Sequence, residues 1–166
     1  MKNFFLRNRE AALALIVAAL ALLVGLRAPV FLTGGNLIDV LNDSSILAIL
    51  VMGQMVVLLT KGIDLSVSSN LALTGMFCAV VGRAFPSLNA FDMVLIALAF
   101  GGLLGILNGA LITLFDLPPI VVTLGTMSAY RGAIFVLSKG AWMNDQDIHP
   151  AIKALPRLQF LGLSGL

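Results

Sequence analysis

The sequence predicts an all-α fold, a polytopic bundle of transmembrane helices with about five spans. Two observations lead to this prediction. The chain is 60% hydrophobic and only 11% charged, whereas a soluble domain is usually nearer half apolar and a quarter charged. Several of its apolar runs also approach the roughly 20 residues that a helix needs to cross the hydrocarbon core. The excess of apolar residues must therefore face lipid.

The first expected span, residues 11–26, follows a short basic segment and resembles a signal peptide at first sight. Arg27 and Pro29 follow it directly, and no small-x-small cleavage site lies at the boundary. We therefore expect a retained transmembrane helix with the amino terminus in the cytoplasm. The other expected spans are residues 44–60, 65–82, 93–115 and 120–138.

Turn-forming residues separate these runs. Thr33-Gly34-Gly35-Asn36 opens a short amphipathic segment, residues 36–42, which we expect to lie in the membrane interface. Asp116-Leu117-Pro118-Pro119 is a break between spans, because proline cannot donate the helical hydrogen bond. A polar loop and the start of an incomplete segment, residues 139–166, follow the helices of residues 1–138. Such an ending is expected of a fragment.

Composition argues against several classes of function. The ten basic residues are scattered, so no nucleic-acid footprint forms. A single cysteine, Cys78, and a single histidine, His149, leave no disulfide and no zinc-binding histidine pair within one chain. No phosphate-cradling loop is present, and a serine–histidine pair built on His149 is a weak proposal. We therefore expect no enzyme, no catalytic residue and no metal site.

A polar break between two apolar runs, Lys61 to Asn70, carries the chemistry of most interest. Water-free hydrocarbon penalises such residues, so the break is a surface turn or lines a protected cavity. Asp64 has two interpretations: a cap for a helix beginning at Leu65, or a pathway group. Serines such as Ser66 cluster just after it, and Gln54 lies within the preceding run, which favours a buried or wet face.

The fourth run contains small residues at a spacing of four: Ala97, Gly101, Gly105 and Gly109. They share one helix face, which predicts close packing against another helix. Asn108 lies beside this strip. Its amide needs a hydrogen-bonding partner, and it is either interhelical glue or a group that lines a pathway.

The last run places Thr123, Thr126 and Tyr130 in one polar stripe, at spacings of three and four. Arg131 follows directly. An arginine in a span is costly unless it is paired or hydrated, so it is either a snorkelling or ion-paired structural residue or a functional one. Asp64 is a candidate ion-pair partner.

These features together resemble a known family. Gly62-Ile63-Asp64-Leu65-Ser66-Val67, residues 105–112, residues 119–127 and Tyr130-Arg131-Gly132 resemble, in order and spacing, the motifs of sugar-type ABC importer permeases of the ribose/rhamnose/autoinducer-2 group. The resemblance covers essentially the whole chain and only the N-terminal part of the family. Further segments are most similar to rhamnose permeases: Gly53-Gln54-Met55, residues 70–76 and Gly140-Ala141-Trp142.

The resemblance implies a multi-pass subunit of the bacterial inner membrane that carries no cofactor of its own. Its implied partners are a second permease chain, identical or different, a periplasmic sugar-binding protein, membrane lipid, and cytoplasmic ATP-binding cassette subunits that hold ATP and Mg. Candidate pathway residues are Gln54, Asp64, Ser66, Asn108, Thr123, Thr126 and Arg131. This chain departs from the family at Ser68, where glycine is usual, and shows no coupling helix.

The function expected from these features is a permease subunit of an ATP-driven importer for a monosaccharide, rhamnose-like, or for autoinducer-2. A truncated, non-transporting scaffold or assembly subunit is the alternative from another class. One half of a secondary transporter is the third, because broken helices also build the binding sites of those proteins.

Overall fold

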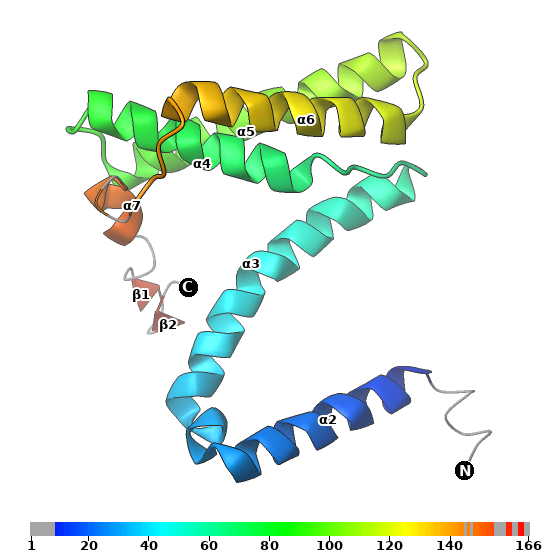
Figure 1. Ribbon diagram of the computed structural model, residues 1–166, viewed down its shortest axis with the longest axis vertical. Coiled ribbons are helices and arrows are strands. Elements are labelled where there is room, and N and C mark those ends of the chain that lie inside the picture. Colours follow the sequence, from blue (N-terminus) through cyan, green and yellow to red (C-terminus); the bar gives the residue numbers. More distant parts are fainter. Residues whose placement is uncertain (1–8, 145, 147, 155–158, 161–162, 165–166) are drawn as a thin grey trace. The chain divides into compact units, whose positions relative to one another are not determined.

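A computed structural model of the chain describes residues 9–144, 146, 148–154, 159–160 and 163–164. Helices dominate it, and Figure 1 shows them in chain order. The chain forms two compact units, Met1–Leu47 and Ala48–Leu166, which are described one at a time below. The elements are α2 (Arg9–Arg27), η1 (Pro29–Leu32), α3 (Gly34–Leu59), α4 (Val67–Ala84), α5 (Ala90–Leu114), α6 (Pro119–Ser138), α7 (Pro150–Ala154), β1 (Gln159–Phe160) and β2 (Leu163–Ser164).

The first unit contains α2, the 3-10 turn η1 and the beginning of α3. Gly25 in α2 is buried, and a side chain there would collide with Leu32 of η1. The missing Cβ therefore lets η1 fold back against the end of α2. Most apolar side chains of α2 are exposed, as in Leu20 and Leu23, which is expected of a helix that faces lipid.

The prediction that residues 36–42 form a separate interfacial segment is wrong. Helix α3 is continuous from Gly34 to Leu59, so the second span begins ten residues before the predicted Ser44. Between Asn36 and Met52 the sequence has no glycine or proline to end a helix. Its polar residues are accommodated: the Ser44 hydroxyl donates to Val40 O at 2.6 Å. The polar residues interrupt the apolar sequence pattern, but the helical backbone hydrogen bonds continue through them.

The second unit is built on three helices that run side by side, α4, α5 and α6 (Figure 1). Helix α4 contacts both of the others. The buried side chains of Leu73, Leu104 and Tyr130, one from each helix, meet at the centre. Phe77 of α4 stacks on Phe100 of α5 with 4.0 Å between ring centroids and 9° between planes. This trio positions the site described below.

Local turn chemistry fixes the ends of these helices. Asn89 and Asp92 form a capping box at the start of α5, because each side chain accepts from the backbone N–H of the other. Asp116 and Lys139 have left-handed φ values of 50° and 53° where α5 and α6 end. The predicted break at the proline pair is confirmed, since α5 ends at Leu114 and α6 begins at Pro119.

The segment after Lys139 contains the short helix α7 and two strands. Gln159 pairs with Ser164 and Phe160 with Leu163 in antiparallel register, so β1 and β2 make two residue pairs. These four strand residues do not change the all-α class of the fold. The domain division at residues 138 and 139 stays a prediction.

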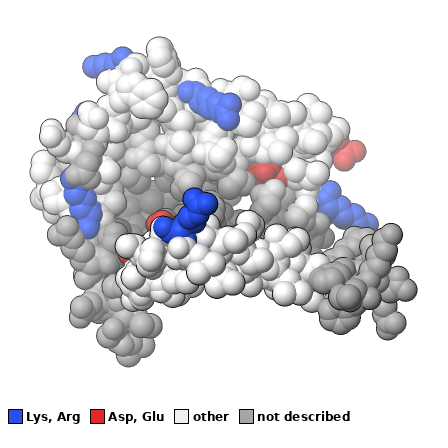
Figure 2. Space-filling view, turned by 60° about the horizontal axis from the view of Figure 1, so that its bottom comes forward, with Lys and Arg blue, Asp and Glu red and all other residues white. Residues whose placement is uncertain are grey.

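The predicted number of spans is confirmed: within the described residues, five helices are long and apolar enough to cross a membrane. Figure 2 shows a surface that is mostly uncharged, with single cationic and acidic side chains on it. The third span starts at Val67 rather than at the predicted Leu65. Its start is set by the residues that also form the candidate site.

The capping box predicts the effect of one substitution. Asn89→Ala removes the acceptor for the Asp92 N–H, and we expect the free energy of unfolding to fall by about 1 kcal/mol. Unfolding of the chain in mixed detergent micelles measures this loss. Asn89→Ser keeps a side-chain oxygen and should recover most of the stability. An equal loss with serine and alanine would contradict the capping role.

Candidate functional site

The candidate site is the connection between α3 and α4, residues 60–66. Helix α3 closes in a tight turn, because the N–H groups of Thr60 and Gly62 both donate to Val57 O at 3.1 Å. Lys61 between them has a left-handed φ of 60°, a conformation that costs energy for a residue with a side chain. From Lys61 the chain runs without helix to Ser66. The sequence break is therefore a structural break.

The Asp64 carboxylate organises this connection. Its Oδ1 accepts from both the backbone N–H and the hydroxyl of Ser66, each at 2.7 Å. Ser66 is the N-cap of α4, and the first helical residue is Val67. The predicted cap is therefore corrected: Asp64 accepts from the N-cap residue instead of from the first helical turn. The carboxylate fixes a local turn that sets where the helix begins.

Asn108 joins α5 to this turn. Its side-chain Nδ2 donates to Ser66 Oγ at 2.8 Å, and both residues are buried. The Tyr130 hydroxyl of α6 donates to Leu104 O at 3.0 Å and lies 3.5 Å from Asn108 Oδ1. We call Asp64, Ser66, Asn108 and Tyr130 the polar junction. The interhelical contact expected of Asn108 is present, and a pathway role stays a prediction.

Two further hydrogen bonds hold the connection by its backbone. Gln54 Nε2 of α3 donates to Asp64 O at 3.1 Å, and Thr123 Oγ1 of α6 donates to Ile63 O at 3.2 Å. These bonds are part-buried, and an unsatisfied backbone carbonyl is costly in a membrane interior. Among the described residues, the buried side-chain oxygen of Gln54, Oε1, has no hydrogen-bond partner. Helices α3, α5 and α6 thus all bind the connection.

A cavity of about 380 Å³ lies beside the polar junction. Its lining combines five polar side chains with small and apolar residues from α3, the connection, α5 and the start of α6. The polar ones are Thr60, Asp64, Asn108, Thr113 and Thr123. Gly105 and Gly109 also line it, and a Cβ added to either would meet no atom within 4 Å. Small residues therefore leave this space open.

The predicted small-residue strip divides into two parts. A Cβ on Gly101 would lie 3.4 Å from Thr74 Oγ1 of α4, and Asn70 Nδ2 donates to Gly101 O at 3.4 Å. Gly101 thus lies in contact with α4. Gly105 and Gly109 face the cavity instead, and Ala97 is half-buried on α5. Close packing along the whole strip stays a prediction.

The remaining candidates lie apart from the cavity lining. Ser66 and Thr126 are buried, and the Thr126 hydroxyl donates to Thr123 O at 3.3 Å. Arg131 is exposed and forms no ion pair with Asp64, both of which lie in the described part of the chain. The suggested pairing of these two residues is therefore absent. The stripe of Thr123, Thr126 and Tyr130 is one buried face, as its spacing predicted.

Sequence reasoning did not select some residues that the structure brings to the site. Tyr130 was placed in the polar stripe but not among the pathway candidates, and its spacing from Thr126 was the available signal. Thr60 and Thr113 line the cavity without any pattern that marks them. No group of three His, Cys, Asp or Glu side chains suited to a metal ion occurs in the part of the chain that the structure describes.

Comparison with known proteins identifies the family. Residues 36–155 match the family described as "Branched-chain amino acid transport system / permease component". The chain belongs to this permease family. The predicted resemblance to ABC importer permeases of the ribose and autoinducer-2 group is thereby confirmed. Family membership and the five membrane-capable helices make the chain a multi-pass protein of the bacterial inner membrane, as expected.

Its curated relatives include the autoinducer 2 import system permease protein LsrC of three bacteria. The protein of Enterobacter sp. (strain 638) is 37% identical over 97% of this chain and 46% of its own length. Those of Shigella flexneri and Escherichia coli (strain K12 / DH10B) are 34% and 33% identical over 100% of this chain and 47% of theirs. The chain thus spans about half the length of these relatives. No solved structure matches it.

The polar junction predicts a measurable coupling between two helices. Asn108→Ala and Ser66→Ala remove the two ends of one buried hydrogen bond, so their effects on unfolding should not add. We expect a coupling free energy of about 0.6 to 1.7 kcal/mol, the range of such bonds in membrane proteins, in a double-mutant cycle measured by unfolding in detergent.

Ser128→Ala provides the control for this cycle, because the Ser128 hydroxyl is exposed and donates to Leu124 O in its own helix. Combined with Asn108→Ala, it should give additive effects to within about 0.5 kcal/mol. Additive effects for Asn108→Ala with Ser66→Ala would remove the interhelical bond as a source of stability.

Proposed function

We propose that this chain forms part of the solute pathway of an ATP-driven importer for a small hydroxylated solute, a rhamnose-like monosaccharide or autoinducer-2. One structural observation carries the proposal: a cavity of about 380 Å³ among membrane-capable helices, lined by a carboxylate, an amide and three hydroxyls. Such groups offer acceptors and donors to a solute rich in hydroxyl groups. The relatives are named as permease proteins of an autoinducer 2 import system, which agrees with this chemistry.

The polar residues divide into two roles in this proposal. Asp64, Asn108 and Thr123 line the cavity and present polar atoms to the passing solute. Gln54, Ser66 and Thr126 position them, because each hydrogen bonds to the backbone or side chains of the site. In this proposal the solute binds only weakly, because it must also leave the pathway.

The proposed importer has partners that supply the energy and deliver the solute. Cytoplasmic ATP-binding cassette subunits hydrolyse ATP with Mg, so no cofactor is needed on this chain. A periplasmic binding protein hands over the solute, and a second permease chain, identical or different, completes the pathway. Arg131 is exposed and is available to anchor such a partner or the lipid headgroups.

The acceptor role of Asp64 predicts a graded effect on transport. Asp64→Ala removes the oxygen that holds both Ser66 donors, and we expect uptake to fall at least tenfold, by analogy with losses on misplacing a site by about 1 Å. Asp64→Asn keeps an acceptor and should retain most of the uptake. Uptake of labelled rhamnose and autoinducer-2 by the complete importer in cells measures both.

Two outcomes would revise this part of the proposal. Normal uptake by Asp64→Ala at an equal membrane level would remove Asp64 from the pathway. Uptake that survives ATP depletion but collapses with the ion gradient would favour a secondary transporter. Absence of uptake of either solute would favour the non-transporting scaffold. Labelled leucine belongs in the same assay, because the family description names branched-chain amino acids.

The open face of α5 allows a steric test of the pathway. Gly105→Leu places a side chain into the cavity, and because its Cβ has no neighbour within 4 Å, the fold should tolerate it. We expect uptake to be blocked while the membrane level and unfolding midpoint stay near wild type. Gly102→Leu is the matched control, since Gly102 is equally uncrowded and exposed but lies outside the cavity lining. Equal uptake by the two variants would place the pathway elsewhere.

A further inference from the structure

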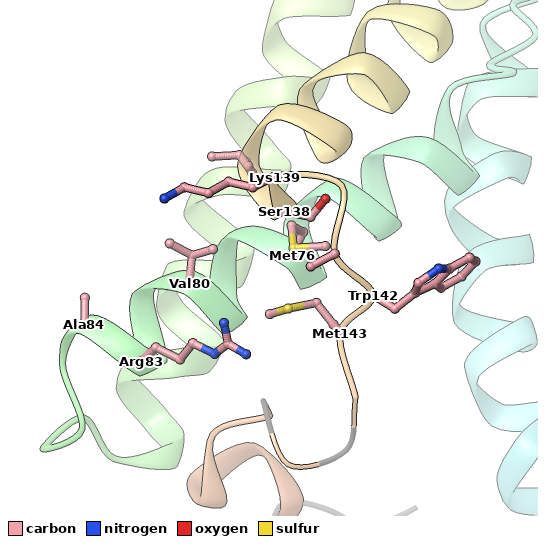
Figure 3. Close-up of a pocket in the computed structure, with 10 residues that line it drawn as sticks. Met76, Val80, Arg83, Ala84, Ser138, Lys139, Trp142 and Met143 are labelled. Atoms are coloured by element: carbon pink, nitrogen blue, oxygen red, sulfur yellow. The ribbon is translucent and has the colours of Figure 1, made fainter.

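A second hollow region lies at the other ends of α4 and α6, away from the polar junction. The connection after α6 returns along the end of α4 there, and a cavity of about 450 Å³ lies between them. Figure 3 shows its lining side chains. Arg83 extends from the last turn of α4 toward Met143, and Lys139 stands at the end of α6. Two cationic side chains from different helices therefore border one cavity.

Among the described residues, the charged side chains that line this cavity are all cationic. Arg83 and Lys139 line it, and no carboxylate is among the described residues of its wall. Ser138 also lines it, but its hydroxyl donates to Phe135 O at 3.2 Å. Arg83 also has an interaction within the chain. A substitution of Lys139 therefore tests the charge of the cavity more directly. Cationic groups that border one cavity match the oxygens of a phosphate group.

A second cavity, of about 340 Å³, adjoins the first and is apolar. The two share Met76 of α4 and Met143 as a common wall. Gly75 lies on the α4 side of the apolar cavity, and Ile148 and Ile152 form the side opposite. The combined space therefore has a cationic end and an apolar end, which is the arrangement that an amphiphile requires.

His149 holds the wall of the apolar cavity in place. Its ring packs on Gly82, where an added Cβ would lie 2.9 Å from His149 Cβ. The Ala151 N–H donates to His149 Nδ1 at 3.2 Å, and His149 Nε2 lies 3.2 Å from Pro86 O. The accepting Nδ1 places the ring proton on Nε2, which then donates to Pro86 O. This buried side chain holds the residue before α7 against the end of α4, and α7 itself contacts α5.

The surroundings place this region at the level of lipid headgroups. Trp142 is 90% exposed, and Figure 3 shows its indole pointing away from the other labelled side chains. Tryptophan, lysine and arginine at the ends of spans mark the membrane–water interface. Cations near helix C-termini also offset the helix dipole. The helix dipole therefore explains why α4 and α6 each end with a cation. It does not explain the apolar cavity beside these two residues.

We propose that the two cavities bind one anionic phospholipid, with its phosphate near Lys139 and Arg83 and part of one acyl chain in the apolar cavity. The cationic wall selects the headgroup charge, and the methionine-lined wall accepts the chain because methionine adapts to irregular shapes. This site is separate from the solute cavity and does not depend on the proposed transport function.

Binding of phosphatidylglycerol by the purified full chain in neutral detergent tests the proposal, with phosphatidylcholine of the same acyl chains and inorganic phosphate as comparison probes. We expect phosphatidylglycerol to bind at least fivefold more tightly than phosphatidylcholine. Lys139→Gln should weaken it roughly fivefold, the effect of about one surface cation. Gly75→Leu should weaken it as well, because the added side chain fills the apolar cavity without a clash at its Cβ.

Each variant has a matched control. Arg27→Gln removes an exposed cation from the end of α2, and Gly102→Leu adds the same bulk outside both cavities. Both should bind phosphatidylglycerol like the wild type, and unfolding midpoints without lipid confirm that all four variants are folded. Equal losses for Lys139→Gln and Arg27→Gln, full binding by Gly75→Leu, or equal affinity for inorganic phosphate would each overturn the proposal.

Discussion

A chain of hydrogen bonds from the Asn108 amide through the Ser66 hydroxyl to the Asp64 carboxylate holds the second unit together where its backbone is least regular. Each bond polarises the next, which strengthens such chains in a medium of low dielectric constant. Because of these hydrogen bonds, the connection between α3 and α4 is not helical and its polar groups are still paired. The cavity lining, the start of α4 and the orientation of α5 all follow from this arrangement.

Much of the fold follows from rules that act locally. Apolar length predicts the five helices, and proline predicts the break before Pro119. The prediction for residues 36–42 is wrong because the polar residues there do not end the helix. Backbone hydrogen bonding continues there, and the Ser44 hydroxyl finds a carbonyl within its own helix. Side-chain polarity determines which face is wet, and it does not by itself end a helix.

The sequence predicts which residues belong to the candidate site better than it predicts which of them are in contact. A buried amide needs a partner, so Asn108 was expected to bind across helices, but no spacing rule identifies Ser66 as that partner across 42 positions. The charge of Arg131 suggested Asp64, yet an exposed guanidinium has water as an alternative. Equal spacing made four small residues look equivalent, whereas Gly101 meets α4 and Gly105 faces a cavity.

The continuity of α3 has a consequence for the membrane itself. Its mainly apolar stretch, residues 46–59, contains the single polar residue Gln54 and rises only about 21 Å at 1.5 Å per residue, against about 30 Å for an average hydrocarbon core. The polar residues just before this stretch, Asp43 among them, belong to the same helix. A lipid-facing α3 therefore draws the bilayer thinner around it or carries a carboxylate below the headgroups. Bilayer thickness thus becomes a variable that sets the stability of this chain.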